Sequence, residues 1–143
     1  MKERKLDSME REKSCGAVIF REENTRRYYL VLKSTQGHTT LCKGHVEGDE
    51  TEHETAAREI REETGLEVEF IHGFRRVITY SPFPGTVKDV VFLLARAGGG
   101  EIACQPEEVE EARFLPLEGA LAALTHPSDR DTLAAADGFL REG

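Results

Sequence analysis

The chain has 143 residues, a formal net charge of −8 and 38% hydrophobic residues. This length and balance predict one domain with its own core, and the acidity argues against an extended nucleic-acid surface. No apolar run approaches the ~18 residues of a membrane-spanning helix, so no membrane segment is expected.

The N-terminal residues 1–13 are charged throughout and contain no apolar segment. They are predicted to form a flexible leader or a short first helix rather than a signal peptide, followed by one domain over residues 14–143. The three cysteines, Cys15, Cys42 and Cys104, form no C-x-x-C pair, and their odd number argues against a disulfide framework. A reduced, cytoplasmic setting is therefore predicted.

The order of predicted elements indicates the fold class. Strands are predicted at Ser14–Arg21, Tyr28–Lys33, Leu66–Ile71, Phe74–Tyr80, Val87–Arg96 and Val109–Leu115. A polar loop is predicted at Ser34–Thr40, and helices are predicted at Thr51–Thr64, Glu118–Leu124 and Ser128–Arg141, with Pro127 in the first turn of the last helix. Strands around a central helix, with helices at the end, predict an α/β sandwich with a mixed sheet.

The central helix is marked at both ends. Thr51, with Glu54 three residues later, has the pattern of a capping box. Gly65 follows the last helical residue, where a left-handed stop favours glycine. The apolar stripe of this helix is narrow and rich in alanine, which allows close packing against a sheet.

The same helix carries Glu59, Glu62 and Glu63 at spacings of three and four, which place them on one helix face. Carboxylates held together repel one another unless a cation lies among them, and a hard divalent ion such as Mg²⁺ or Mn²⁺ suits oxygen ligands. Arg58 is expected to pair with Glu62 and to leave the other two carboxylates for metal. The plainer alternative is a solvated acidic helix face.

The surroundings of these acids favour the metal site. Gly44, five residues, Glu50, seven residues and then Arg58–Leu66 (REIREETGL) match every specified position of the Nudix box, G-x5-E-x7-R-E-U-x-E-E-x-G-U with U aliphatic. The chain thus resembles the Nudix, or MutT-like, family of hydrolases. The resemblance implies an α/β/α sandwich that hydrolyses a nucleoside diphosphate linked to another moiety, with Mg²⁺ or Mn²⁺ as cofactor.

The resemblance also implies roles for individual residues. The implied metal ligands are Glu59, Glu62, Glu63 and the carbonyl of Gly44, and the implied catalytic residues are Arg58 and the same three glutamates. Glu59 and Glu63 are expected as the firmest ligands, whereas Glu62 is expected either as a ligand or as the general base. Glu50 is expected to stiffen the loop by hydrogen bonding.

Outside the box, the chain is similar to the asymmetrical diadenosine tetraphosphate hydrolase branch. The similarity rests on Lys43–Glu47 (KGHVE), on the opening strand Ser14–Phe20 and on Gly73–Arg76 followed by Tyr80. It implies a small-molecule nucleotide substrate, most simply diadenosine tetraphosphate or another dinucleoside polyphosphate.

Further site residues are implied by the same similarity. The implied substrate contacts are His38, Lys43, Tyr80 and Lys88, and Glu108 is implied as an additional residue near the metal. Each has a plainer interpretation: a surface or strand-edge lysine, a solvated histidine, a sheet-packing aromatic or a charged loop.

The chain departs from this branch in two places. The branch has an aromatic residue and two prolines where this chain has Thr39–Cys42, and an adenine-stacking tyrosine where it has Ala112. Because stacking on an aromatic is worth ~1–3 kcal/mol per base, altered base recognition is expected, with metal and phosphate chemistry retained. Arg113 or Phe114 is a candidate replacement for the stacking group.

These departures leave other functions open. The alternative substrates are a nucleotide sugar, an RNA 5′ end and an inositol pyrophosphate. A further alternative is a non-catalytic Nudix domain that senses a ligand, although such domains often lose box glutamates and this box retains them.

Overall fold

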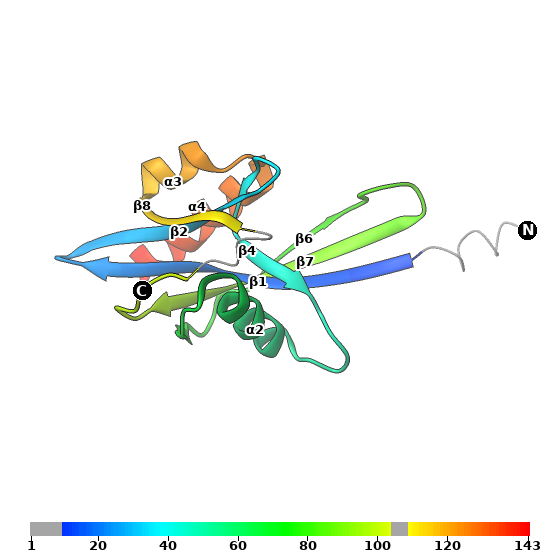
Figure 1. Ribbon diagram of the computed structural model, residues 1–143, viewed down its shortest axis with the longest axis horizontal. Coiled ribbons are helices and arrows are strands. Elements are labelled where there is room, and N and C mark those ends of the chain that lie inside the picture. The colour runs from blue at the N-terminus through cyan, green and yellow to red at the C-terminus, as the bar shows by residue number, and fades with distance from the viewer. Residues whose placement is uncertain (1–9, 104–108) are drawn as a thin grey trace, which may run out of the picture.

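The computed structural model describes residues 10–103 and 109–143 of the chain. Within these ranges, eight strands form one mixed sheet, and helices cover both of its faces (Figure 1). The strands are β1 (Glu10–Glu23), β2 (Arg26–Ser34), β3 (Thr39–Thr40), β4 (Cys42–His45), β5 (Val68–Phe70), β6 (Arg76–Tyr80), β7 (Thr86–Ala97) and β8 (Val109–Pro116). The helices are α2 (Glu52–Thr64), α3 (Leu117–Ala123) and α4 (Pro127–Glu142). The predicted α/β sandwich with a mixed sheet is confirmed.

The centre of the sheet is the parallel pair of β1 and β7, which lie side by side along most of their length (Figure 1). The remaining strands run antiparallel to their partners. The main order of the sheet is β3-β2-β1-β7-β5. In addition, β4 pairs with β1, β6 pairs with β7, and β8 pairs with β2. On the side away from β7, β1 pairs first with β4 and then, further along the chain, with β2. Within the described chain β4 pairs with β1 alone, so β4 lies at an edge of the sheet.

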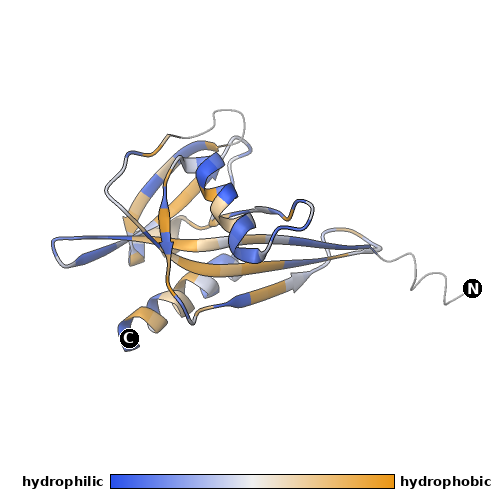
Figure 2. Cartoon of the chain, turned by 90° about the horizontal axis from the view of Figure 1, so that it is seen from below, coloured by the Kyte–Doolittle hydropathy of each residue, from blue (hydrophilic) through white to orange (hydrophobic). Residues whose placement is uncertain are grey.

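Two hydrophobic cores lie on opposite faces of this sheet. The first core joins the sheet to α2, and the second joins it to α3 and α4. Along β1, Cys15 and Ala17 enter the first core, whereas Val18 and Phe20 enter the second. A strand segment covered on both faces buries successive side chains, which explains the apolar run Cys15–Phe20 in the middle of β1. Figure 2 shows apolar residues along the central strands and hydrophilic residues over the outside of α2.

Helix α2 has both predicted ends. The Thr51 hydroxyl accepts a hydrogen bond from the Glu54 amide at 3.1 Å, and the Glu54 carboxylate accepts one from the Thr51 amide at 2.8 Å. Gly65 ends the helix with φ at 73°, and its amide donates to the Arg61 carbonyl at 2.9 Å. The capping box and the glycine stop are therefore confirmed.

The predicted leader is wrong for its last four residues, because β1 begins at Glu10. Residues 10–13 pair in parallel with Thr86–Asp89 of β7. Because strand pairing uses backbone groups, it tolerates the charged side chains of these residues. Arg11 forms an ion pair with Asp89, and Lys13 forms one with Glu52. Residues 1–9 lie outside the described part of the chain.

Two short strands were not predicted. The predicted polar loop Ser34–Thr40 ends in β3, and β4 follows almost at once with the first residues of the K-G-H-V-E segment. Both strands depend on partners far along the chain, because β3 pairs with β2 and β4 pairs with β1. The last helix is as predicted, with Pro127 in its first turn.

None of the helices in the described residues is long and apolar enough to span a membrane.

Candidate active site

Arg58 is the centre of the polar network on α2. Its Nε donates to Glu50 Oε2 at 2.7 Å, and its Nη1 donates to Glu59 Oε2 at 2.8 Å and to Glu62 Oε1 at 3.1 Å. Its Nη2 donates to the His45 carbonyl at 2.8 Å. The predicted pair with Glu62 is present, but the expectation that Arg58 leaves Glu59 free is wrong, because one nitrogen reaches both carboxylates.

Glu50 holds the loop between β4 and α2. Its Oε1 accepts hydrogen bonds from the Glu47 amide at 3.0 Å and from the Thr55 hydroxyl at 2.9 Å. The hydrogen bond from the Arg58 guanidinium, together with that from the Glu47 amide, lowers the pKa of Glu50 to about 2. The hydrogen bonds predicted for Glu50 in this loop are present.

Glu59 packs directly over Gly44. Its side chain is only 13% exposed, and a Cβ on Gly44 would overlap its carboxylate. Gly44 therefore provides the space in which the Glu59 carboxylate lies. The glycine that begins the box and the glutamate of its Arg58-Glu59 pair, 15 positions apart in sequence, form one contact.

Glu63 and Glu62 point to different partners. Glu63 Oε1 accepts a hydrogen bond from the Cys42 thiol at 3.2 Å, and burial, followed by the Glu63 charge, raises the pKa of that thiol. The Glu62 side chain is 48% exposed and turns toward Arg58. Among the described residues, no group of three or more His, Cys, Asp or Glu side chains has the arrangement of a metal site. The donors nevertheless are carboxylate oxygens, the type that Mg²⁺ and Mn²⁺ prefer, so their chemistry fits a hard divalent ion.

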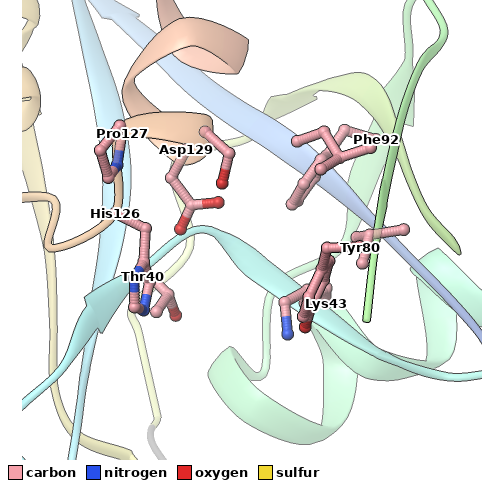
Figure 3. Close-up of a pocket in the computed structure, with 10 residues that line it drawn as sticks. Thr40, Lys43, Tyr80, Phe92, His126, Pro127 and Asp129 are labelled. Atoms are coloured by element: carbon pink, nitrogen blue, oxygen red, sulfur yellow. The ribbon is translucent and has the colours of Figure 1, made fainter. Parts of the chain in front are cut away.

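A pocket of about 410 Å³ lies on the face of the sheet opposite α2. It is lined by Thr40, Lys43, Ile78, Tyr80, Val90, Phe92, His126, Pro127, Ser128 and Asp129 (Figure 3). Its volume falls in the range of ~300–1,000 Å³ that is usual for small-molecule sites. Two of the predicted substrate contacts, Lys43 and Tyr80, thus line one pocket.

Lys43 also joins this pocket to the acidic helix. It lines a second cavity of about 100 Å³ together with Glu63. Because successive residues of a strand point to opposite faces, Cys42 enters the core beside α2 while Lys43 turns to the pocket. The edge position of β4 therefore places Lys43 between the pocket and the box glutamates.

The other predicted substrate contacts lie outside the pocket lining. His38 stacks on His126 of the pocket lining, with ring centroids 5.4 Å apart. Lys88 pairs in register with Tyr80 and is half-buried, and burial, followed by the charge of Lys43, lowers its pKa. Glu108 lies outside the described residues.

The candidates for replacing the missing stacking tyrosine do not reach this pocket. Arg113 pairs with Glu111 at 3.2 Å, and the Arg21 guanidinium covers the Phe114 ring at 4.1 Å from its centroid. The aromatic side chains that do line the pocket are Tyr80, Phe92 and His126.

Sequence reasoning missed His126 and Asp129. Both lie at the start of α4, where the sequence shows only a proline that begins a helix. Two hydrogen bonds bring this segment to β3, from the Thr39 amide to Thr125 Oγ1 at 2.8 Å and from the Thr125 amide to the Thr39 carbonyl at 2.9 Å. No local pattern marks a contact between segments so distant in sequence.

Comparisons with known proteins agree with the box and the fold. Residues 10–136 match the NUDIX domain family. The bis(5′-nucleosyl)-tetraphosphatase [asymmetrical] of Mus musculus is 34% identical over 140 residues, which cover 90% of this chain and 95% of the mouse protein. The NAD-capped RNA hydrolase NudC of Salmonella paratyphi C is 31% identical over 84% of this chain and 47% of its own length.

Solved structures show the same fold. A binary complex of the Ap4A hydrolase of C. elegans superposes with a TM-score of 0.84 at 24% identity, covering 92% of this chain and 99% of that one. With the family match over most of the sequence and the intact box, the chain belongs to the Nudix family of hydrolases.

Proposed function

We propose that this Nudix hydrolase cleaves dinucleoside polyphosphates, such as diadenosine tetraphosphate, with Mg²⁺ or Mn²⁺. The observation that carries the proposal is the position of Lys43, which lines both the pocket and the cavity beside Glu63. A nucleoside bound in the pocket would extend its phosphates over Lys43 toward the box glutamates. The curated mouse relative, an asymmetrical bis(5′-nucleosyl)-tetraphosphatase, supports the substrate class.

The residues that would hold the ion are Glu59, Glu62, Glu63 and the carbonyl of Gly44. Bound there, a divalent ion would neutralise negative charge on the phosphate oxygens and polarise the phosphoryl group. The contact between Glu59 and Gly44 and the hydrogen bond from Arg58 hold Glu59 in place for this role.

The remaining steps belong to the chain's own side chains. The Lys43 ammonium would bind phosphate oxygens, and the positive charge of the half-buried Lys88 nearby would strengthen the attraction. One of the box glutamates would accept the proton of the attacking water. The acidic chain thus has a local cationic surface beside its carboxylates, as a polyphosphate substrate requires.

A substrate panel tests the proposed class. With Mg²⁺ or Mn²⁺ present, kcat/KM would be measured for dinucleoside tetraphosphates, a nucleotide sugar, NAD-capped RNA and an inositol pyrophosphate. We expect the dinucleoside tetraphosphates to rank first and to yield a nucleoside triphosphate and monophosphate. A higher kcat/KM for any other member would contradict the proposed class, and tight binding without turnover would favour a sensor domain.

One observation favours the RNA 5′ end as the second candidate. The NAD-capped RNA hydrolase relative is 31% identical over 84% of this chain. That relative is about twice as long as the matched region, so its whole activity does not transfer directly. Turnover of NAD-capped RNA above that of the dinucleoside tetraphosphates would establish this alternative.

A further inference from the structure

Asp129 is a buried carboxylate in the pocket wall. Its relative exposure is 5%, although it lies in the first turn of α4 beside exposed residues. Among the residues that the structure describes, one hydrogen bond reaches this carboxylate, from the Leu41 amide to Oδ2 at 3.4 Å. Figure 3 shows the carboxylate pointing into the space between His126 and Tyr80. A buried carboxylate with one long hydrogen bond retains capacity for further donors.

The surroundings of Asp129 leave its charge incompletely compensated. Burial raises the pKa of its carboxyl, while the Leu41 amide, the Lys43 charge and the His126 charge lower it. Within the described chain, no Lys, Arg or His forms an ion pair with Asp129. Donors from a ligand would therefore stabilise this carboxylate more than donors in open water.

The pocket has the other features of a base-binding site. Val90 and Phe92 provide a buried apolar floor, and His126 and Tyr80 provide ring surfaces at the sides. Lys43, which lines the same pocket, lies where the phosphates of a bound nucleotide would leave it. The base would then meet Asp129, at the side of the pocket formed by α4.

We propose that this pocket is the nucleobase subsite and that Asp129 selects guanine over adenine. The proposal rests on the proposed function and adds the base that the substrate carries. Guanine presents two adjacent N–H donors on its Watson–Crick edge, and both suit the two oxygens of one carboxylate. Adenine presents one amino donor beside a ring nitrogen whose lone pair repels a carboxylate, so adenine leaves one oxygen unpaired.

Asp129→Asn gives a sharp test because it exchanges the preference. An amide offers one acceptor and one donor, which match the amino group and ring nitrogen of adenine. It also keeps an oxygen for the Leu41 amide, and thermal unfolding checks that the variant is folded. Asp131→Asn, an exposed change on the same helix, is the matched control.

The assay compares kcat/KM for diguanosine and diadenosine tetraphosphate and, without turnover, the Kd values of GMP and AMP. We expect the wild-type protein and Asp131→Asn to prefer guanine by at least about 10-fold. Asp129→Asn should shift the ratio toward adenine by about 10-fold to 100-fold, the discrimination that one bidentate pair provides.

Two results would overturn the proposal: equal or better use of adenine by the wild-type protein, or an unchanged ratio in Asp129→Asn. The binding arm separates this proposal from the proposed function. The wild-type protein could fail to hydrolyse either dinucleotide and still bind GMP more tightly than AMP, with Asp129→Asn removing that preference. This result would contradict the proposed substrate class alone. Efficient hydrolysis of both dinucleotides, without any base preference, would contradict the guanine subsite alone.

Discussion

The contact between Gly44 and Glu59 joins the glycine that begins the Nudix box to the first glutamate of its helical part. The carboxylate lies where a side chain on residue 44 would have to be, and Arg58 holds it from the other side. A glycine in strand β4 would ordinarily weaken pairing, since it adds no packing surface. Here the absence of a side chain on Gly44 leaves the space in which the carboxylate of Glu59, a proposed metal ligand, lies.

Gly44→Ala tests this interpretation. The added methyl group would overlap the Glu59 carboxylate, which is the end of a flexible side chain and can turn away. We therefore expect a large fall in kcat with a loss of unfolding free energy of only about 1–3 kcal/mol, as for other small-to-large changes in packed sites. Steady-state kinetics and urea unfolding measure the two effects.

Gly98→Ala is the control for this variant, since a Cβ at residue 98 meets nothing within 4 Å. It should leave both kcat and stability close to those of the wild-type protein. If Gly44→Ala retained wild-type kcat, the proposed role of the Glu59 position would be contradicted.

The elements differ in how far the sequence predicts them. Helix α2 could be predicted closely because its determinants are local: Thr51 and Glu54 cap one end, and Gly65 ends the other. Strand β4 could not, because its four residues pair with β1, about 28 positions earlier in the chain. The burial of Asp129 depends on Leu41, 88 positions away, so the pocket was beyond prediction from local pattern.

The same distinction holds within the candidate site. The spacing of the box identified Arg58 and the three glutamates, but the sequence did not show that Arg58 bonds to both Glu59 and Glu62. That arrangement depends on side-chain rotamers and on the His45 carbonyl of another element. Lys43 and Tyr80 were identified by resemblance, and the structure places both in the lining of one pocket.

Glu52 ties three elements together. Its carboxylate accepts hydrogen bonds from Lys13 of β1 at 2.9 Å and from Arg75, just before β6, at 2.8 Å. The hydrogen bond from Arg75, followed by that from Lys13, lowers the pKa of Glu52 to about 2, although burial opposes the shift. A carboxyl whose pKa is lower in the folded state stabilises the fold above its unfolded pKa.

Glu52→Gln should therefore destabilise the protein at neutral pH and lose its effect in acid. The contribution of Glu52 is fully present above about pH 4.5 and is lost as the pH falls through about 2. Urea unfolding of the wild-type protein and the variant at pH 7 and at pH 2 measures the difference. Glu118→Gln, at an exposed position on α3, serves as the control. An equal difference between Glu52→Gln and wild type at both pH values would contradict this account.

The candidate site lies on both faces of one sheet. The box glutamates lie on the α2 face, and the pocket lies between the sheet and α4. Because β4 is an edge strand, a bound nucleotide can pass around the edge of the sheet at Lys43 without crossing a packed core. The base and the reacting phosphate would thus be bound by separate layers of the sandwich. Residues of the pocket, such as Thr40, can then differ between relatives while the box on the other face is retained.

The role proposed for the box glutamates is the metal-dependent hydrolysis of a polyphosphate chain. It is tested most directly by the Mg²⁺-dependent kcat of Glu59→Gln and Glu63→Gln with diadenosine tetraphosphate, with Glu67→Gln, whose side chain is 83% exposed, as the control. We expect both site variants to fold and their kcat to fall by more than about 100-fold. Mutation of residues that only support metal ligands already lowers metal affinity or activity by about 10–100-fold. Near-wild-type turnover in both variants would contradict this role of the glutamates.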